Sequence, residues 1–304
     1  MAKRLVFFNH KGGVSKTTSV YNIGWMISKN HRVLIVDADP QCNLSSLMLS
    51  DNFEEYYTND NTKHKNIKDG VASTFEGKPI PISPVSCINL ARAPNLFLLA
   101  GHANLSEYDG PLTFAQISNN AIATLQNLPG AFSEMMRLTE EEYKIDYTII
   151  DLNPSLSSIN QNLFLISNSF IIPTNPDPFS IMALDTLKSV LPRWMEWKTT
   201  ALEIFKDSAY PLPNGSPKFL GALIQRFNIR KGKAARPYPQ AQSNPQEPWA
   251  YPDAALPIFR HWFRHEYLPT KYPTYILTKS HLLGGQQNAK QIAEMYQPKA
   301  IEQK

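Results

Sequence analysis

A loop that combines glycine, lysine and threonine follows the first apolar segment of the chain, residues 4–9. The loop reads His10-Lys11-Gly12-Gly13-Val14-Ser15-Lys16-Thr17-Thr18. A nucleoside triphosphate needs main-chain N–H groups at close range, a lysine for its β- and γ-phosphate oxygens and a hydroxyl for Mg²⁺. The two glycines, Lys16 and Thr17 supply these groups in that order along the chain. The loop therefore predicts a phosphate site that binds a nucleotide with Mg²⁺.

The segments beside the loop are those that such a site requires. Residues 4–9 contain apolar aromatics, which is typical of a buried parallel strand. A helix is expected to begin near Lys16, because small or apolar residues recur at helical spacing on one face: Val20, Ile23, Gly24 and Ile27. The general pattern GxxxxGK(S/T) is broken, since His10 and Ser15 occupy its two fixed glycine positions. On that pattern alone, an ordinary turn between strand and helix stays open.

Acidic residues stand at the ends of two further apolar segments. Asp37 and Asp39 follow residues 32–36, and Asp151 ends residues 147–151. In open α/β sheets, ligands bind at the carboxyl ends of the strands, so these acids are expected near the glycine loop. The alternatives are a solvated Asp-Pro turn after Asp39 and a strand that merely ends in an acid at Asp151.

The octet from Lys11 to Thr18 resembles the deviant Walker A box, KGGVGKTT, of the ParA/MinD family of P-loop ATPases, with one departure at Ser15. The resemblance implies that this chain binds and hydrolyses ATP with Mg²⁺. It also implies that Lys11 reaches across an ATP-bound homodimer to the partner's phosphates, as an arginine finger does. The residues expected to bind the nucleotide are Lys11, Gly12, Gly13, Val14, Ser15, Lys16, Thr17 and Thr18.

The acidic segments resemble the switch regions of the same family. Residues 37–41 are similar to its DxDPQ switch I, which implies that Asp39 positions the attacking water and supports Mg²⁺, while Asp37 is structural. Residues 151–155 are similar to its Walker B and switch II, commonly DTPP, although Asn153 replaces a proline. The resemblance thus assigns catalysis to Lys11, Lys16 and Asp39, and the Mg²⁺ site to Thr17, Asp39 and Asp151.

Alternating strands and helices predict an α/β fold. Further strands are expected at residues 170–173 and 219–225, with helical stretches at residues 158–167 and 180–197. A doubly wound, mostly parallel sheet with flanking helices follows, as in P-loop NTPases of the SIMIBI type. We interpret residues 1–304 as a single ATPase domain with a polar, partly helical surface insertion at about residues 50–94. The resemblance places the adenine contacts at Gln225, Arg226 and Phe227.

A basic, proline-rich excursion is expected at about residues 229–275. It opens with the basic cluster Arg230, Lys231, Lys233 and Arg236. Because partition ATPases of the family bind DNA without sequence preference, these residues are candidates for phosphate contacts with nonspecific DNA. A solvated charged face beside a proline-stiffened loop is the alternative interpretation.

Composition limits where the protein acts. The chain has two cysteines, Cys42 and Cys87, and its apolar runs are of strand length, which predicts neither a cysteine-bound metal cluster nor a membrane span. The apolar segment near the N-terminus is too short for a signal peptide, and residues 285–296 lack the basic, amphipathic character of the MinD membrane anchor. A cytoplasmic location follows, associated with the nucleoid if DNA is bound.

The leading hypothesis is an ATP-driven dimerisation switch for plasmid or chromosome partitioning. Slow hydrolysis stimulated by a ParB-like partner would then release the dimer from DNA. One alternative keeps the ATPase but makes the cargo something other than DNA. Another, of a different class, is a nucleotide-stabilised scaffold with little hydrolysis, in which Ser15 and Asn153 have impaired turnover.

Overall fold

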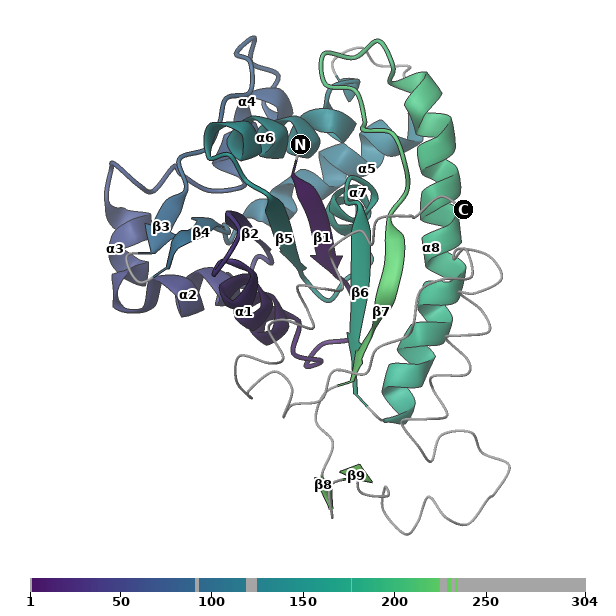
Figure 1. The fold of residues 1–304 in the computed structure, drawn as a ribbon. Coiled ribbons are helices and arrows are strands. Elements are labelled where there is room, and N and C mark those ends of the chain that lie inside the picture. The colour runs from purple at the N-terminus through teal and green to yellow at the C-terminus, as the bar shows by residue number, and fades with distance from the viewer. Residues whose placement is uncertain are drawn as a thin grey trace, which may run out of the picture.

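The computed structural model describes residues 2–90, 93–118, 125–175, 177–224, 229–230 and 233–234. A seven-stranded sheet with the order β3-β4-β2-β5-β1-β6-β7 forms its centre (Figure 1). Its strands are β1 (Lys3–Phe7), β2 (Val33–Ala38), β3 (Ile88–Leu90), β4 (Ala93–Leu99), β5 (Tyr147–Leu152), β6 (Ser169–Thr174) and β7 (Lys218–Ile224). Neighbouring strands run parallel, apart from the antiparallel edge pair β3 and β4.

Helices connect the strands and cover both faces of the sheet. The α-helices are α1 (Lys16–Ile27), α2 (Asn43–Leu49), α3 (Phe53–Thr58), α4 (Ala72–Phe75), α5 (Asp109–Ile117), α6 (Leu128–Glu142), α7 (Ser158–Leu165) and α8 (Pro178–Ile204). Short 3₁₀ helices are η1 (Ser50–Asn52), η2 (Asp69–Val71) and η3 (Leu105–Tyr108). A separate two-stranded ladder pairs β8 (Ile229–Arg230) with β9 (Lys233–Ala234).

Two hydrophobic cores lie on opposite faces of the sheet. Along β1 and the residue after it, Val6 and Phe8 belong to the core that includes side chains of α5, α6, α7 and α8. Leu5 and Phe7 belong to the core that includes side chains of α1, α2 and α3. Because successive side chains of a strand point to opposite faces, a strand covered on both sides is apolar throughout. The predicted doubly wound α/β fold is confirmed.

The expected strand, loop and helix at the N-terminus are confirmed. Helix α1 begins at Lys16, and the four residues of the predicted face are buried. Gly24 is required for close packing of this helix on the sheet, because a Cβ at this position would lie 2.3 Å from Ile35 Cδ1. The sequence therefore sets both where α1 starts and which face it turns towards β2.

Helix α8 is longer than predicted, since it continues to Ile204 and contains Pro192 in its interior. A proline removes one helical hydrogen bond and crowds the preceding turn. Buried side chains on both sides of it, including Leu191, Trp194 and Ala201, pack in the core. Tertiary packing thus outweighs the local preference of proline to end the helix.

The stretch at about residues 50–94 includes short helices but is more deeply integrated than a surface insertion. Ile67 and Val71 are fully buried in the core, and Val85 is also buried there. The N–H of Val85 donates to Thr139 Oγ1 of α6 at 3.1 Å. These apolar residues are isolated between polar ones, so no periodic pattern marked them as core.

Candidate functional site

The glycine loop crosses from β1 to α1 at the carboxyl edge of the sheet. Asn9, which is fully buried, holds both sides of the crossing: its Oδ1 accepts from the Lys11 N–H at 2.9 Å, and its Nδ2 donates to Pro173 O at 2.8 Å. Gly13 has a φ of 71°, which a side chain would disfavour. Asn175 Nδ2 donates to Gly13 O at 3.2 Å. The loop is therefore fixed to the end of β6.

The N-terminus of α1 opens onto this loop without a side-chain cap. Ser15 is the N-cap residue and accepts no hydrogen bond with its side chain. The first N–H groups of a helix lack intrahelical partners, and the helix dipole places partial positive charge there. This end of α1 is consequently suited to bind a phosphate group.

Ser15 adopts a left-handed conformation, with φ 61° and ψ 34°. Such a conformation costs a residue with a Cβ roughly 1 kcal/mol relative to glycine. We expect Ser15→Gly to raise the free energy of unfolding by up to about 1 kcal/mol, measured by urea denaturation without nucleotide. Ser28, at the other end of α1 with φ −64°, is the matched control, and Ser28→Gly should destabilise the protein instead. Equal effects at both positions would contradict the argument from φ.

Lys16 is buried at the centre of the loop. Its Nζ donates to Asn9 O at 3.0 Å and to Lys11 O at 3.3 Å. Burial lowers the pKa of Lys16, while the charges of Asp151 and Asp39 act in the opposite direction. The ammonium group is thus placed within the phosphate loop and within the electrostatic reach of both acids.

The two acids at the end of β2 have different environments. Asp37 is fully buried and accepts hydrogen bonds from Ser45 N and Ser45 Oγ, each at 2.7 Å. Burial raises the pKa of Asp37 to about 6, although these hydrogen bonds counteract the effect. Asp39 Oδ1 accepts from the Gln41 N–H at 2.9 Å, which shapes the turn after the strand. Asp37 therefore anchors α2, whereas the charge of Asp39 acts on Lys16.

Asp151, at the end of β5, is a buried acid with little hydrogen bonding to its carboxyl group. Both of its carboxylate oxygens are buried without a well-formed hydrogen bond in the part of the chain that the structure describes. Burial raises the pKa of Asp151 to about 8, whereas the nearby Thr17 hydroxyl and Lys16 lower it. A buried carboxyl group without a well-formed hydrogen bond among the described residues fits a site for a cation and its bound water.

The donor set agrees with Mg²⁺ held together with a nucleotide. Thr17, Asp39 and Asp151 offer oxygen atoms, which Mg²⁺ prefers, and phosphates commonly supply further ligands. Among the described residues, no group of three or more histidine, cysteine or acidic side chains is arranged to hold a metal ion.

Asp151→Asn is expected to stabilise the nucleotide-free protein at pH 8 by roughly 1–3 kcal/mol. The folded protein keeps the Asp151 proton up to a pKa of about 8, whereas the unfolded chain loses it near its ordinary value of 3.8. The stability associated with this proton is complete below about pH 4 and is lost as the pH rises towards 8. Asparagine does not titrate, so the variant does not lose stability in this way as the pH rises. Thermal unfolding at pH 5 and pH 8 checks the prediction.

The same variant should lose the stabilisation that Mg²⁺ with ATP gives the wild type. Asp60→Asn is the control, because the side chain of Asp60 is 88% exposed and lies outside the site. A stability gain for Asp151→Asn that is the same at both pH values would show that the carboxyl is not the cause.

Lys11 is held by the N-terminus of α8 in the same chain. Its Nζ lies 2.5 and 2.6 Å from the two carboxylate oxygens of Asp177 and 3.0 Å from Ser180 Oγ. Although partial burial acts to raise it, the pKa of Asp177 is lowered overall by Lys11 and by the Ser180 N–H. Phe179 lies below the ammonium group, with its ring centre 6.0 Å from Nζ.

Asp177 is a residue of the site that was not predicted from the sequence. A usable signal was present, since Asp followed by proline is typical of a helix N-cap and first turn, and this pair follows a strand. That signal predicts the start of α8 but not the partner of Lys11. The partner became visible only when the fold brought the two residues together.

Several expected contacts lie outside the described residues. These are the adenine candidates Gln225, Arg226 and Phe227 and the basic residues Lys231 and Arg236. The backbones of Arg230 and Lys233 form one of the two residue pairs that join β8 to β9. Within the part of the chain that is described, no helix combines the length and the apolar character needed to cross a bilayer.

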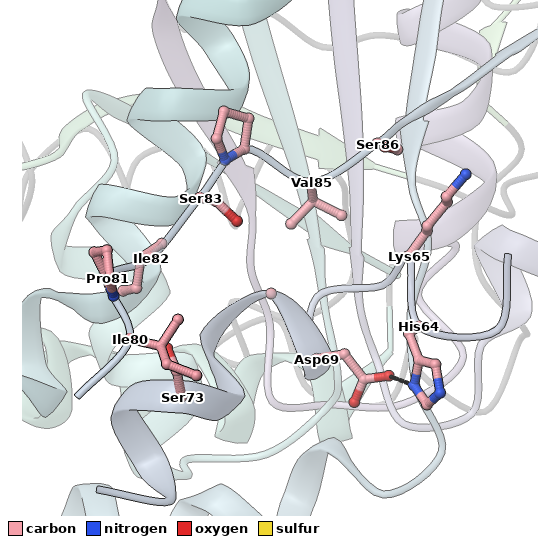
Figure 2. A pocket seen from close by; sticks show the side chains of 12 residues that line it. His64, Lys65, Asp69, Ser73, Ile80, Pro81, Ile82, Ser83, Val85 and Ser86 are labelled. Carbon is pink, nitrogen blue, oxygen red and sulfur yellow. Dashed lines mark hydrogen bonds and ion pairs between the residues drawn. The ribbon is translucent and has the colours of Figure 1, made fainter. Parts of the chain in front are cut away.

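A pocket of about 290 Å³ is formed by other residues, in the stretch between α3 and β3 (Figure 2). His64 and Asp69 lie together in its lining, with His64 Nδ1 2.9 Å from Asp69 Oδ2. Ile80 and Val85 form apolar parts of its wall. None of the predicted site residues lines this pocket. It therefore has no part in the nucleotide site.

Two family models match the chain. The AAA_31 model, described as an AAA domain, matches residues 2–204, and the model of the BstA C-terminal domain matches residues 223–282. The virulence plasmid ParA family protein pGP5-D of Chlamydia muridarum (strain MoPn / Nigg) is 30% identical over 192 residues, which cover 62% of this chain and 60% of that protein. The chromosome-partitioning ATPase Soj of Treponema pallidum (strain Nichols) is 28% identical over 206 residues, covering 67% and 69%. The matches thus span about three fifths of the length of the pGP5-D relatives.

Solved structures share the fold. Protein DIP2308 from Corynebacterium diphtheriae superposes with a TM-score of 0.71 at 20% identity, covering 96% of this chain and 98% of that one. A putative plasmid partition protein from Borrelia burgdorferi B31, bound to AMPPNP, gives 0.57 at 18% identity with 97% of both chains covered. Cobyrinic acid a,c-diamide synthase from Mycobacterium smegmatis, with an ATP analogue and magnesium, gives 0.54 at 20%, covering 97% and 92%.

The phosphate loop at the start of α1, the acids at the ends of β2 and β5 and the mostly parallel sheet agree with these matches. The AAA_31 match covers more than half of the chain, and curated relatives include ParA and Soj proteins. The chain belongs to the AAA_31 family of ParA/Soj-type P-loop ATPases.

Proposed function

We propose that this protein is an ATP-hydrolysing dimerisation switch that takes part in DNA partitioning. The observation that carries the ATPase proposal is the convergence of Lys16, Thr17 and the buried carboxyl group of Asp151 at the uncapped N-terminus of α1. Cation, hydroxyl, acid and open N–H groups together form the set that phosphoryl transfer requires. The site therefore suits ATP better than a ligand without phosphates.

Each group has a defined role in the proposed reaction. The N–H groups of the loop and of the first turn of α1 bind the phosphates, with Lys16 balancing their charge. Thr17, Asp39 and Asp151 would hold Mg²⁺, which when bound offsets negative charge on the β- and γ-phosphates. Asp39 orients the attacking water, and the Asn9 bonds keep the loop in a fixed conformation.

Dimerisation is supported by the surface beside Lys11. Phe179 and Met182 stand one helical turn apart on α8, with exposed fractions of 71% and 65%. Exposed apolar side chains next to a charged group are typical of a surface that another protein covers. A second copy of the chain fits this surface, because Lys11 would then exchange Asp177 for the partner's phosphates.

Partitioning of DNA is the proposed use of the switch. It is supported by the similarity to a chromosome-partitioning ATPase and to plasmid ParA proteins, and by the basic cluster at residues 230–236. In this proposal, ATP-bound dimers bind DNA nonspecifically in the cytoplasm, and a ParB-like protein stimulates hydrolysis. Residues 1–304 act as one ATPase domain with a basic excursion at about residues 229–275.

A cargo other than DNA is the second candidate. The AAA_31 match ends at residue 204, and residues 223–282 match a different family model, that of the BstA C-terminal domain. Because residues 223–282 match a separate family model, they are consistent with a binding partner that other AAA_31 proteins do not share. The ATPase mechanism would be unchanged, and only the bound object would differ.

Binding of the full chain to nonspecific duplex DNA decides between these uses. It should be measured with ATP, with ADP and without nucleotide over a salt series, with the oligomeric state recorded in parallel. ATP-dependent dimers that bind DNA and release it at higher salt are the expected result. Dimers without affinity for DNA would favour the other cargo, and the absence of ATP-dependent dimers would overturn the switch itself.

A further inference from the structure

One buried side chain holds the turn that follows Asp151. Asn160 on α7 is fully buried, and its Nδ2 lies close to four oxygen atoms of Asn153 and Ser155. The distances are 2.6 Å to Asn153 Oδ1, 3.0 Å to Asn153 O, 2.8 Å to Ser155 O and 3.1 Å to Ser155 Oγ. Two of these atoms are main-chain carbonyl oxygens, which only accept, so the amide nitrogen must face them.

Asn153 stands where the ParA/MinD pattern has a proline. A proline ring fixes φ near −65°, whereas asparagine leaves this angle free. Here Asn153 Oδ1 accepts from Asn160 Nδ2 and also from Ser155 Oγ at 2.5 Å, and Ser155 N donates to Asn153 O at 3.0 Å. Hydrogen bonds therefore provide the restraint that a ring would otherwise give.

The turn lies against the phosphate loop. Pro154, between the two residues that Asn160 holds, has its Cγ 4.0 Å from the place that a Cβ on Gly12 would occupy. The turn also begins two residues after Asp151. A change in its conformation would consequently move Pro154, which lies beside Gly12 of the loop, and the segment that directly follows Asp151.

Packing alone does not explain an amide at position 160. Its Oδ1 is buried without a donor among the described residues. An unpaired buried oxygen is unfavourable, and an apolar side chain would avoid it. The residue is better explained by what its nitrogen holds than by its contribution to the core.

We propose that Asn160 is the positioning residue for the turn at residues 153–155. Its amide restrains the turn by hydrogen bonds, where the family pattern has a proline ring. The proposal rests on the ATPase function proposed above. Without the amide, the phosphate loop still binds ATP, but the turn spends less time in the conformation that hydrolysis needs. The effect is therefore on the rate of the chemical step and not on affinity.

Asn160→Ala and the double variant Asn160→Ala with Asn153→Pro test this. The single variant should keep its ATP affinity within about threefold and lose about tenfold or more in single-turnover hydrolysis. Hydrogen exchange at the amides of Ser155 and Ser157 should become faster. The added proline should restore both the rate and the protection to within about threefold of the wild type, because it restricts the turn independently.

Asn162→Ala is the matched control. Asn162 is equally buried on the same helix, but its Nδ2 donates to Pro129 O at 2.7 Å, away from the turn. Its loss should lower the melting temperature without changing the turnover rate or the exchange at Ser155 and Ser157. This control separates a general loss of stability from a loss of positioning.

Unchanged turnover in Asn160→Ala, or equal losses of affinity and rate that proline does not restore, would overturn the proposal. Absence of hydrolysis in the wild type would instead contradict the ATPase function. The exchange measurement separates these failures, since it reports on the turn without any reaction. Normal protection in Asn160→Ala would show that the amide does not hold the turn.

Discussion

Lys16→Ala is expected to weaken the binding of ATP with Mg²⁺ by at least about 100-fold, corresponding to roughly 3 kcal/mol. The Lys16 ammonium lies inside the phosphate loop, where it donates to the carbonyl oxygens of Asn9 and Lys11. Both bonds are replaceable by phosphate oxygens, which carry full charge and bind an ammonium more strongly. Titration calorimetry with a non-hydrolysable ATP analogue measures the change.

Lys198 offers a matched control. It is also a buried lysine held by two main-chain carbonyls, Leu165 O at 2.6 Å and Gly215 O at 2.5 Å, but it lies on α8 outside the loop. Lys198→Met should lower the melting temperature and leave the ATP affinity within about threefold of the wild type. If both variants lose affinity equally, the loss reflects general destabilisation and the assigned role of Lys16 is wrong.

Lys11→Ala is expected to retain ATP binding within about threefold and to lose on the order of 100-fold or more in stimulated turnover. Lys11 is tied to Asp177, so in the isolated chain it is not committed to the phosphates. A charge supplied by the partner stabilises the transition state and contributes only after dimerisation. ATPase assays at several protein concentrations, with size-exclusion chromatography in ATP, measure both effects.

Lys188 is the control for this variant, because it lies on α8 and forms an ion pair with Asp185. Lys188→Ala should leave dimerisation and turnover unchanged. Wild-type turnover in Lys11→Ala would remove the dimer mechanism. If ATP affinity falls by the same factor as turnover, Lys11 contacts the phosphates of the ATP bound to its own chain.

Local patterns in the sequence sufficed for the strands that carry the site and for the helix that begins at Lys16. Glycine loops, apolar strands and helix faces are encoded by neighbouring residues, so they can be predicted without the fold. The antiparallel edge strand β3 and the buried part of residues 50–94 were not predicted. Their apolar residues are few and scattered. Val85 belongs to the core that includes α6, whereas Ile88 and Leu90 of β3 are partly buried against the core on the other face of the sheet.

The partners of the site residues were beyond prediction for a different reason. Asp177 is 166 positions from Lys11 in sequence, and only the arrangement of β1 beside β6 brings them together. The Asn160 amide was equally hidden, because an asparagine on a helix has many possible partners. Long-range hydrogen bonds depend on the complete topology, whereas a motif depends on adjacent residues.

Asp177 binds two groups at once, and this has a consequence for how easily Lys11 can leave. Besides pairing with Lys11, its Oδ1 accepts from the Ser180 N–H at 2.8 Å and caps α8. When Lys11 departs, the cap remains and the helix does not fray. With side chains 22% and 33% exposed, an ion pair of this kind contributes only about 1 kcal/mol or less. The ion pair is thus weak, and Lys11 can leave it without unfolding the N-terminus of α8.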